Sequence, residues 1–246
     1  MVLVLTSCLD LYTKDEFNNR IPQHFGNKNN ILKVLKENTK KFDNFLFVSN
    51  GFPDEISNPY FEATVKSFEM TLPFKNYYVL NNETRDSAKK LVKDADFIFL
   101  CGGHLPTQNK FFKEINLKAL LQNTTAIVVG GSAGSMNCAE TVYCPPEIEG
   151  ESLDKNFKRF FSGLGLTKIN ILPHFDTFQD FVLDDKDFIK DIILPDTTKV
   201  KVIALNDGSY ILCKNGIEQI YGESYILENG KIVKLSELDE TVDIKF

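Results

Sequence analysis

Short apolar segments alternate with amphipathic segments through the first two thirds of the chain. The apolar segments are rich in β-branched and aromatic residues, as buried parallel strands are, and they occupy residues 2–7, 45–49, 76–80, 96–101 and 125–130. Between them, apolar side chains recur at helical spacing, as in the sets Ile31, Leu32, Leu35; Phe61, Val65, Phe68; Ala88, Leu91, Val92; and Phe111, Phe112, Ile115, Leu120. This alternation predicts an α/β fold, an open and mostly parallel sheet with helices on both faces.

The pattern changes after residue 139. Residues 140–160 contain Pro145-Pro146 and several acids, which predicts a surface loop. A strand is expected at 169–172, a helix at 184–194 and a further strand at 200–205. Segments 209–213, 217–221, 224–228 and 231–235, joined by turn sequences, predict an antiparallel meander as a C-terminal extension. We find no internal repeat, and we expect residues 1–246 to form a single domain.

Composition narrows the class of protein. The formal net charge is −6 and there are only three arginines, Arg20, Arg85 and Arg159, which argues against a nucleic-acid or anionic-membrane surface. The apolar start, residues 1–5, is too short for a signal peptide, and no apolar run approaches a membrane span, so we expect a cytoplasmic protein. The five cysteines are scattered and form no C-x-x-C pair, which predicts reduced thiols. With only three histidines besides, we expect neither a metal site nor a cofactor.

The segment Gly130-Gly131-Ser132-Ala133-Gly134 carries the first candidate chemistry. It follows the apolar run 126–129 and precedes a stretch of small residues, which is the pattern of a nucleophile elbow between a strand and a helix. Glycines allow the close approach of backbones in such a turn, and the turn projects Ser132 toward a substrate. The Ala133 amide is then a candidate oxyanion donor. The alternative is a strand-to-helix turn that merely binds an anion.

A serine nucleophile needs a histidine base and an orienting acid. His24 lies in a polar stretch and is expected to be an exposed loop residue, whereas His104 and His174 each follow a predicted strand. His174 is the better base because it follows a Pro-His junction on a strand other than that of Ser132. Ligand-binding crevices of open α/β sheets lie at such strand ends.

The orienting acid is expected at a further strand end, where Asp207 lies in Asn206-Asp207-Gly208. Asp176 and Glu147 are competing acids. With Asp207, the chain order is serine, histidine, acid, which differs from the order in ordinary α/β-hydrolases and argues against an esterase or lipase of that type. Gly103, at the end of the 96–101 strand, is the candidate for the second oxyanion amide.

Taken together, these motifs resemble the dipeptidase E family of serine peptidases. The matching pieces are Cys101-Gly102-Gly103, residues 130–135, Gly163-Leu164-Gly165-Leu166 leading to Pro173-His174-Phe175, and Leu205-Asn206-Asp207-Gly208. The resemblance implies a class I glutamine amidotransferase-like, flavodoxin-like fold in which serine replaces the usual cysteine nucleophile. It also implies cytoplasmic hydrolysis of small peptides with an N-terminal aspartate, with Ser132 as nucleophile and His174 as base.

Two departures from that family bear on the site. The third triad member of the family is a glutamate where this chain has Asp207, and Glu147 falls where the family has another acid, so Glu147 stays a reserve candidate. The family also uses an arginine after the histidine region to recognise aspartate, and this chain has no arginine after Arg159. The sequence therefore does not support strict Asp-X specificity.

We therefore predict a serine peptidase that acts on small peptides through Ser132, His174 and Asp207 and an acyl-enzyme, with the Gly103 and Ala133 amides as the oxyanion hole. The alternative is a non-catalytic module on the same fold that binds a carboxylate, a phosphate or another small molecule. A third hypothesis, an amidotransferase-like enzyme, would need a cysteine at position 132; Cys138, farther along, is expected to pack in the core. The sequence predicts no oligomeric state.

Overall fold

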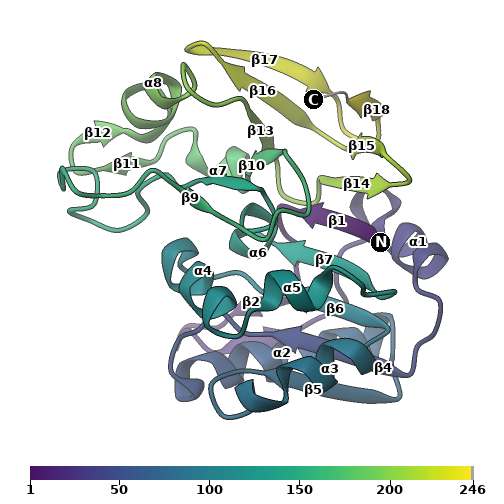
Figure 1. Ribbon diagram of the computed structural model, residues 1–246. Coiled ribbons are helices and arrows are strands. Elements are labelled where there is room, and N and C mark those ends of the chain that lie inside the picture. The colour runs from purple at the N-terminus through teal and green to yellow at the C-terminus, as the bar shows by residue number, and fades with distance from the viewer. Residues whose placement is uncertain (245–246) are drawn as a thin grey trace.

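The centre of the computed structural model is an eight-stranded sheet whose parallel and antiparallel strands occupy separate halves (Figure 1). The structure describes residues 1–244. The parallel half runs β5 (Asn76–Leu80), β4 (Asn44–Val48), β6 (Phe97–Leu100), β7 (Ile127–Gly131) and β1 (Val2–Thr6). The antiparallel half continues with β14 (Tyr210–Lys214), β15 (Ile217–Tyr221) and β18 (Thr241–Ile244).

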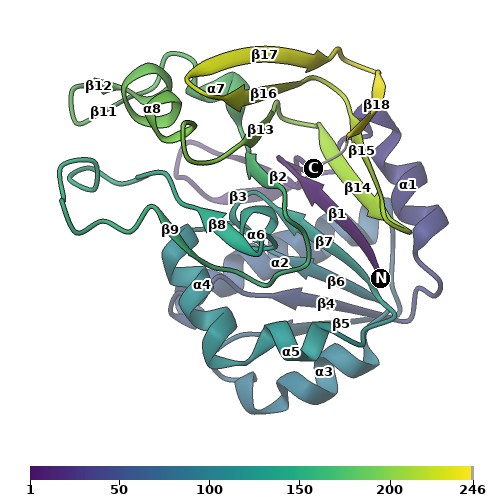
Figure 2. The same cartoon turned by 45° about the horizontal axis from the view of Figure 1, so that its top comes forward.

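Helices cover both faces of this sheet (Figure 2). Because side chains alternate along a strand, Leu3 and Leu5 of β1 pack in one buried cluster and Val4 packs in the other. The cluster around Val4 includes α1 (Ile31–Asn38) and α2 (Asp54–Thr71); the cluster around Leu3 includes α3 (Ala88–Asp94), α4 (Leu105–Glu114), α5 (Leu117–Leu121) and α6 (Ala133–Met136). The predicted open α/β fold is confirmed. Within residues 1–244, no helix has the length and apolar character needed to cross a bilayer.

A second sheet of four strands lies at the end of the molecule opposite β5 (Figures 1 and 2). Its order is β10 (Asn170–Leu172), β13 (Val202–Leu205), β16 (Ser224–Glu228) and β17 (Lys231–Ser236), with β10 and β13 parallel and the other pairs antiparallel. The predicted C-terminal antiparallel extension is confirmed, because β14 pairs with β15 and β16 with β17 in antiparallel fashion. The four strands do not form one meander, however, since the two pairs belong to different sheets. Ile220 of β15 packs in the core of the main sheet, whereas Leu227 of β16 packs in a separate cluster with β13.

The segment between the sheets differs from the prediction in two places. Its expected surface loop, residues 140–160, begins with β8 (Thr141–Tyr143), which pairs with β9 (Phe160–Ser162), and Tyr143 is buried. The expected helix at 184–194 starts only at Phe188, after the hairpin of β11 (Val182–Leu183) and β12 (Lys186–Asp187). Asp184 and Asp185 both have positive φ, 51° and 60°, which forms the two-residue hairpin turn instead of a helical turn.

The remaining elements are short. A hairpin of β2 (Tyr12–Lys14) and β3 (Arg20–Pro22) packs against α2. The other short helices are α7 (Phe175–Phe178), a π-helical segment at Phe188–Ile193, α8 (Leu194–Asp196), and 3-10 turns at Lys28–Asn30 and Arg85–Ser87. As predicted, Phe188, Ile189, Ile192 and Ile193 are buried.

Candidate active site

Ser132 lies at a strained turn between β7 and α6. Its backbone has φ 51° and ψ −118°, outside the regions that residues with a side chain usually adopt, and its N–H donates to the carbonyls of Thr6 and Ser7 at 3.1 Å each. Gly134 has to be glycine, because a Cβ there would lie 2.1 Å from the Leu100 carbonyl oxygen. The backbones of β6, β7 and α6 thus hold the serine at the carboxyl end of the main sheet.

His174 and Asp207 come from the second sheet. The parallel register of β10 and β13 places Leu172 beside Ala204, so the segments that follow both strands leave at the same end of that sheet. His174 then turns the chain into α7 with φ 57°. The expected single open sheet would place both strands in the sheet that carries Ser132. The structure instead brings the serine from one sheet, and the histidine and aspartate from another, to the place where the sheets meet.

The three side chains form a continuous hydrogen-bonded chain. Ser132 Oγ lies 3.0 Å from His174 Nε2, and His174 Nδ1 lies 2.8 Å from Asp207 Oδ1. The side chains of His174 and Asp207 are 29% and 23% exposed, so the pair is partly shielded from solvent. This spacing is that of a nucleophile, a base and an acid that orients the base.

Ser7 is a member of this network that the sequence analysis missed. The buried hydroxyl of Ser7 donates to Asp207 Oδ1 at 2.7 Å and accepts from the backbone N–H of His174 at 2.7 Å. It thereby ties the acid to the backbone of the base. Its signal in the sequence is weak: Thr6-Ser7 are the first polar residues after the apolar run of β1, the strand that pairs with β7.

For a peptidase that uses Ser132, His174 and Asp207, as the sequence predicts, we expect Ser7→Ala to lower kcat for peptide hydrolysis about 10-fold, because the change removes one donor to Asp207 and leaves the His174 N–H without its acceptor. KM is expected to change less than kcat, since Ser7 contacts the Asp207 carboxylate and the His174 backbone N–H and not His174 Nε2. Kinetics together with the melting temperature test this. Ser49→Ala is the matched control, because the buried Ser49 hydroxyl has no hydrogen-bond partner within residues 1–244. An unchanged kcat in Ser7→Ala would refute the positioning role.

The surroundings of His174 and Asp207 raise the pKa of the imidazole and lower the pKa of the carboxyl group. Burial alone would lower the pKa of His174, but the hydrogen bond and charge of Asp207 outweigh it and the pKa lies above its ordinary value. Burial likewise would raise the pKa of Asp207, but hydrogen bonds from His174 and Ser7 and the charge of His174 hold it below its ordinary value. Near neutral pH, Asp207 is thus a carboxylate that can stabilise a protonated His174.

Backbone amides beside Ser132 are free to bind an oxyanion. Gly103 has φ 145°, and a Cβ on it would lie 2.8 Å from Cβ of Asn50. The Asn50 amide donates to the Gly102 carbonyl at 3.3 Å, which fixes this loop. Within residues 1–244, neither the Gly103 N–H nor the Ala133 N–H donates a hydrogen bond to another protein group. These two amides are therefore the candidates to stabilise negative charge that develops on a bound substrate.

The competing acids lie nearby in other positions. Asp176 accepts the Asp207 N–H at 3.1 Å and so supports the turn that presents Asp207. Glu147 lines a cavity together with Ser132 and His174, but the carboxylate that hydrogen-bonds to His174 is that of Asp207. Burial, with the charge of Glu151, raises the pKa of Glu147 to about 7.

The other histidines and the cysteine near the elbow have separate surroundings. His104 hydrogen-bonds to Thr107 at 2.8 Å and to Glu151 at 3.2 Å, and His24 is exposed. Cys138 is buried, with its Sγ 3.2 Å from the Gly134 carbonyl oxygen, and burial raises its thiol pKa. A buried thiol of this kind is a poor nucleophile. Within residues 1–244, no group of three or more His, Cys, Asp or Glu side chains could hold a metal ion.

Two cavities flank Ser132 and His174. The first has a volume of about 280 Å³, and the residues that shape it include Asp10, Tyr12, Phe47, Tyr60 and Phe99. The second has a volume of about 190 Å³, and the residues that shape it include Met136, Glu147, Phe178, Phe181 and Phe188. Gly103, Ser132 and His174 line both. A bond placed at Ser132 Oγ would therefore border both cavities, each of a size for one amino-acid residue or a small group.

Comparisons with known proteins give the family and the fold of this chain. The model of peptidase family S51 matches residues 22–220, which include Ser132, His174 and Asp207. A crystal structure of a candidate peptidase E from Listeria monocytogenes is similar with a TM-score of 0.58 at 15% identity, over 96% of this chain and 98% of that one. At that identity the likeness shows the fold. A search of curated proteins gave no match.

Proposed function

This chain belongs to peptidase family S51, and we propose on that premise that it hydrolyses small peptides through a Ser132–His174–Asp207 triad and an acyl-enzyme. Membership makes it a serine peptidase of the dipeptidase E type. The single observation that supports the finer proposal is the hydrogen-bonded chain from Ser132 Oγ through both ring nitrogens of His174 to Asp207 Oδ1.

In the first step, Ser132 Oγ attacks the carbonyl carbon of the scissile amide. The Oγ–H proton passes to His174 Nε2 as the new C–O bond forms, and Asp207 stabilises the imidazolium through Nδ1–H. The carbonyl oxygen becomes an oxyanion, which the Gly103 and Ala133 N–H groups bind.

In the second step, the imidazolium returns the proton to the leaving nitrogen and the C–N bond breaks. The amine product departs, and the acyl group stays on Ser132 as an ester. A water molecule then attacks the ester carbonyl while His174 Nε2 accepts its proton. The C–Oγ bond breaks, the proton returns to Ser132, and the carboxylic acid product leaves. Every proton that Nε2 accepts in this cycle is released again within it.

Hydroxylamine trapping tests the acyl-enzyme. A panel of unblocked dipeptides is incubated with the purified protein and increasing hydroxylamine, and the products are resolved by mass spectrometry. We expect an aminoacyl hydroxamate whose share rises with hydroxylamine, because hydroxylamine competes with water for the ester. Hydrolysis that depends on Ser132 without any hydroxamate would contradict the covalent step, and an uncatalysed control without protein corrects for direct aminolysis.

The pH dependence of kcat/KM follows from the raised pKa of His174. The base is competent only as the neutral imidazole, so kcat/KM rises with pH as His174 loses its proton. Since the Asp207 interaction places that pKa above the ordinary value of about 6.5, we expect the midpoint of the acid limb above pH 6.5. In Asp207→Asn the midpoint is expected to move to lower pH. A pH-rate profile of both proteins measures this, and an acid limb at the same pH in both would contradict the assigned coupling.

A further inference from the structure

The smaller cavity beside Ser132 has an apolar wall of three phenylalanines. The Phe178 and Phe188 rings lie 4.8 Å apart between centroids, and the Phe181 and Phe188 rings lie 5.2 Å apart. Phe188 is buried, so this wall is anchored in the core around β10 and β13. Within residues 1–244, no lysine or arginine lines this cavity. A substrate aspartate placed here would lose its hydration without a cation to pair with, whereas an apolar side chain would gain from burial.

The one acid in this lining lacks a cation. Glu147 is largely shielded from solvent, and among the ion pairs of the described residues it has no partner. Burial and the like charge of Glu151 raise its pKa, whereas the charge of His174 and a hydrogen bond from the backbone of Leu105 lower it, so among the described residues a neutral donor is present but no lysine or arginine. A carboxylate in an apolar cavity is stabilised by a cation that comes with the ligand, and a peptide's free α-ammonium is such a group.

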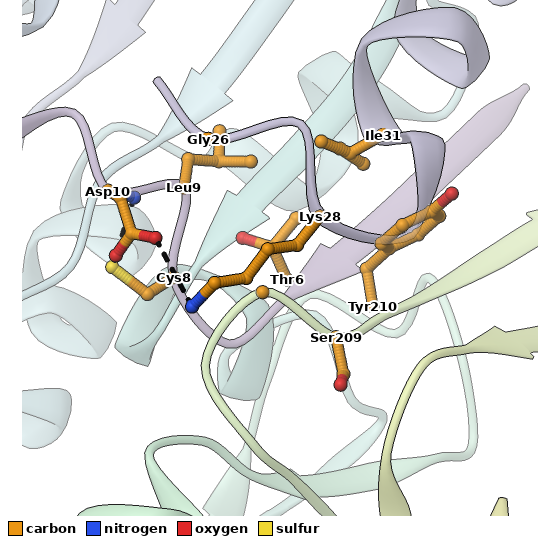
Figure 3. A pocket seen from close by; sticks show the side chains of 10 residues that line it. Thr6, Cys8, Leu9, Asp10, Gly26, Lys28, Ile31, Ser209 and Tyr210 are labelled. Atoms are coloured by element: carbon orange, nitrogen blue, oxygen red, sulfur yellow. Dashed lines mark hydrogen bonds and ion pairs between the residues drawn. The ribbon is translucent and has the colours of Figure 1, made fainter. Parts of the chain in front are cut away.

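The larger cavity is electrostatically different. Its acid, Asp10, already pairs with Lys28, whose Nζ lies 3.7 Å from Asp10 Oδ2; Figure 3 shows this ion pair in a different, smaller pocket that Asp10 also lines. Lys28 Nζ also lies 3.4 Å from the Asp207 carbonyl oxygen. An ammonium bound beside Asp10 would have to compete with this lysine. The ammonium of a substrate is therefore better accommodated beside Glu147, which leaves the larger cavity, with Tyr12 and Tyr60, for the leaving residue.

On the basis of the function proposed above, we infer that the enzyme prefers dipeptides and small peptides with a free N-terminus and a large apolar first residue. The side chain of that residue occupies the Phe178–Phe181–Phe188 cavity, and its α-ammonium pairs with the Glu147 carboxylate. The carbonyl of the same residue then lies at Ser132 Oγ, between the two cavities. This preference differs from the N-terminal aspartate that resemblance to dipeptidase E implies.

Four peptides test the preference on the full chain: Phe-Ala, Leu-Ala, Asp-Ala and N-acetyl-Phe-Ala. We expect kcat/KM for Phe-Ala and Leu-Ala to exceed that for Asp-Ala at least about 10-fold, because an unpaired carboxylate in an apolar cavity is costly. Acetylation of Phe-Ala is expected to lower kcat/KM about 10- to 100-fold, since it removes a charged hydrogen-bond donor. Parallel calorimetric titrations of Ser132→Ala with the same peptides give the preference independently of turnover.

Glu147→Gln separates recognition of the ammonium from a structural effect. In this variant the penalty for acetylation is expected to fall to about threefold or less, because the charged partner is gone. Glu149→Gln, an exposed acid two residues away, is the matched control and should keep the full penalty. The fold is checked by Tm. Burial raises the pKa of Glu147 to about 7 in the folded protein, compared with about 4.5 in the unfolded chain. Ionisation of Glu147 therefore lowers the stability of the folded state as the pH rises from 4.5 to 7. Glu147→Gln removes this loss, so it should raise Tm more at about pH 8 than at about pH 4.5.

The outcomes separate this inference from the proposed function. Ser132-dependent hydrolysis that favours Asp-Ala, or that tolerates N-acetyl-Phe-Ala, would overturn the inference and leave the serine mechanism standing. An acetylation penalty that persists in Glu147→Gln would overturn the role of Glu147. An absence of any Ser132-dependent hydrolysis by the parent, together with an absence of peptide binding to Ser132→Ala, would overturn both the inference and the proposed function.

Discussion

Replacing Ser132 with alanine is expected to lower kcat for peptide hydrolysis by about 10⁴- to 10⁶-fold, the range for loss of a serine nucleophile that acts as one unit with its base. Without Oγ there is no group for His174 Nε2 to deprotonate and no ester to form. The fold should persist, because the backbone of residue 132, which donates to Thr6 and Ser7, is unchanged. Peptide turnover by mass spectrometry, with Tm as the folding check, measures the effect.

The matched control for this variant is Ser162→Ala. Ser162 is an exposed serine on β9, outside both cavities, and its loss should leave kcat unchanged. If folded Ser132→Ala retained activity within 10-fold of the parent, the chemistry would have to lie with another group.

Asp207→Asn is expected to lower kcat by about 10³- to 10⁴-fold with little change in KM, as an acid-to-amide change does in triads of this kind. The carboxylate oxygen that now accepts from His174 Nδ1–H would be exchanged for an amide, which can present an N–H to the ring instead. The imidazole would then hold its proton on Nε2 and could not accept one from Ser132. The loss of the carboxylate charge also removes the main stabilisation of the imidazolium.

Two neighbouring acids serve as controls for Asp207. In Asp176→Asn the amide oxygen can still accept the Asp207 N–H, so we expect kcat within a few-fold of the parent. In Glu147→Gln we expect kcat to fall far less than in Asp207→Asn, because Glu147 borders the cavity and does not hydrogen-bond to His174. A larger loss in Glu147→Gln than in Asp207→Asn would transfer the role of orienting acid to Glu147.

The main features of the fold could be predicted from the sequence because they depend on local periodicity. In apolar runs such as 45–49 and 96–101 both faces of the strand are apolar, so both must be covered by helices. The structure has this arrangement, with alternate residues of these strands in the two buried clusters. The helix predicted at 184–194 shows the limit of that reasoning. Its apolar residues have helical spacing, but the backbone of Asp184 and Asp185 forms a hairpin turn, which periodicity does not encode.

The sequence motifs were a better guide to the candidate site than to the sheet arrangement. The glycines around Ser132 stand close to one another in the chain, so their pattern is visible in the sequence, although the Leu100 carbonyl that requires Gly134 belongs to another strand. The division of β14 to β17 between two sheets depends instead on which core each strand packs against. Ser7 lies 167 residues from His174 along the chain, and the two meet only where the main sheet, which holds β1, and the second sheet, which holds β10, come together.

The shorter acid in this chain is compatible with a closed triad. Aspartate is one methylene shorter than the glutamate of dipeptidase E, yet Asp207 Oδ1 lies 2.8 Å from His174 Nδ1. Two contacts hold the Asp207 segment close to the histidine: Ser7 Oγ bonds to the carboxylate, and Asp176 accepts the backbone N–H. With these contacts, the shorter side chain lies within hydrogen-bond distance of the imidazole.

The most direct test of an activated Ser132 is fluorophosphonate labelling read by intact mass. The reagent requires a deprotonated serine and forms a stable phosphonyl ester, so it reports the nucleophile without any assumption about the substrate. We predict one adduct on the parent protein and none on Ser132→Ala, with the adduct retained in Glu147→Gln. A folded parent that stays unmodified by both a bulky and a small fluorophosphonate, or a Ser132→Ala variant that is labelled equally, would contradict the account.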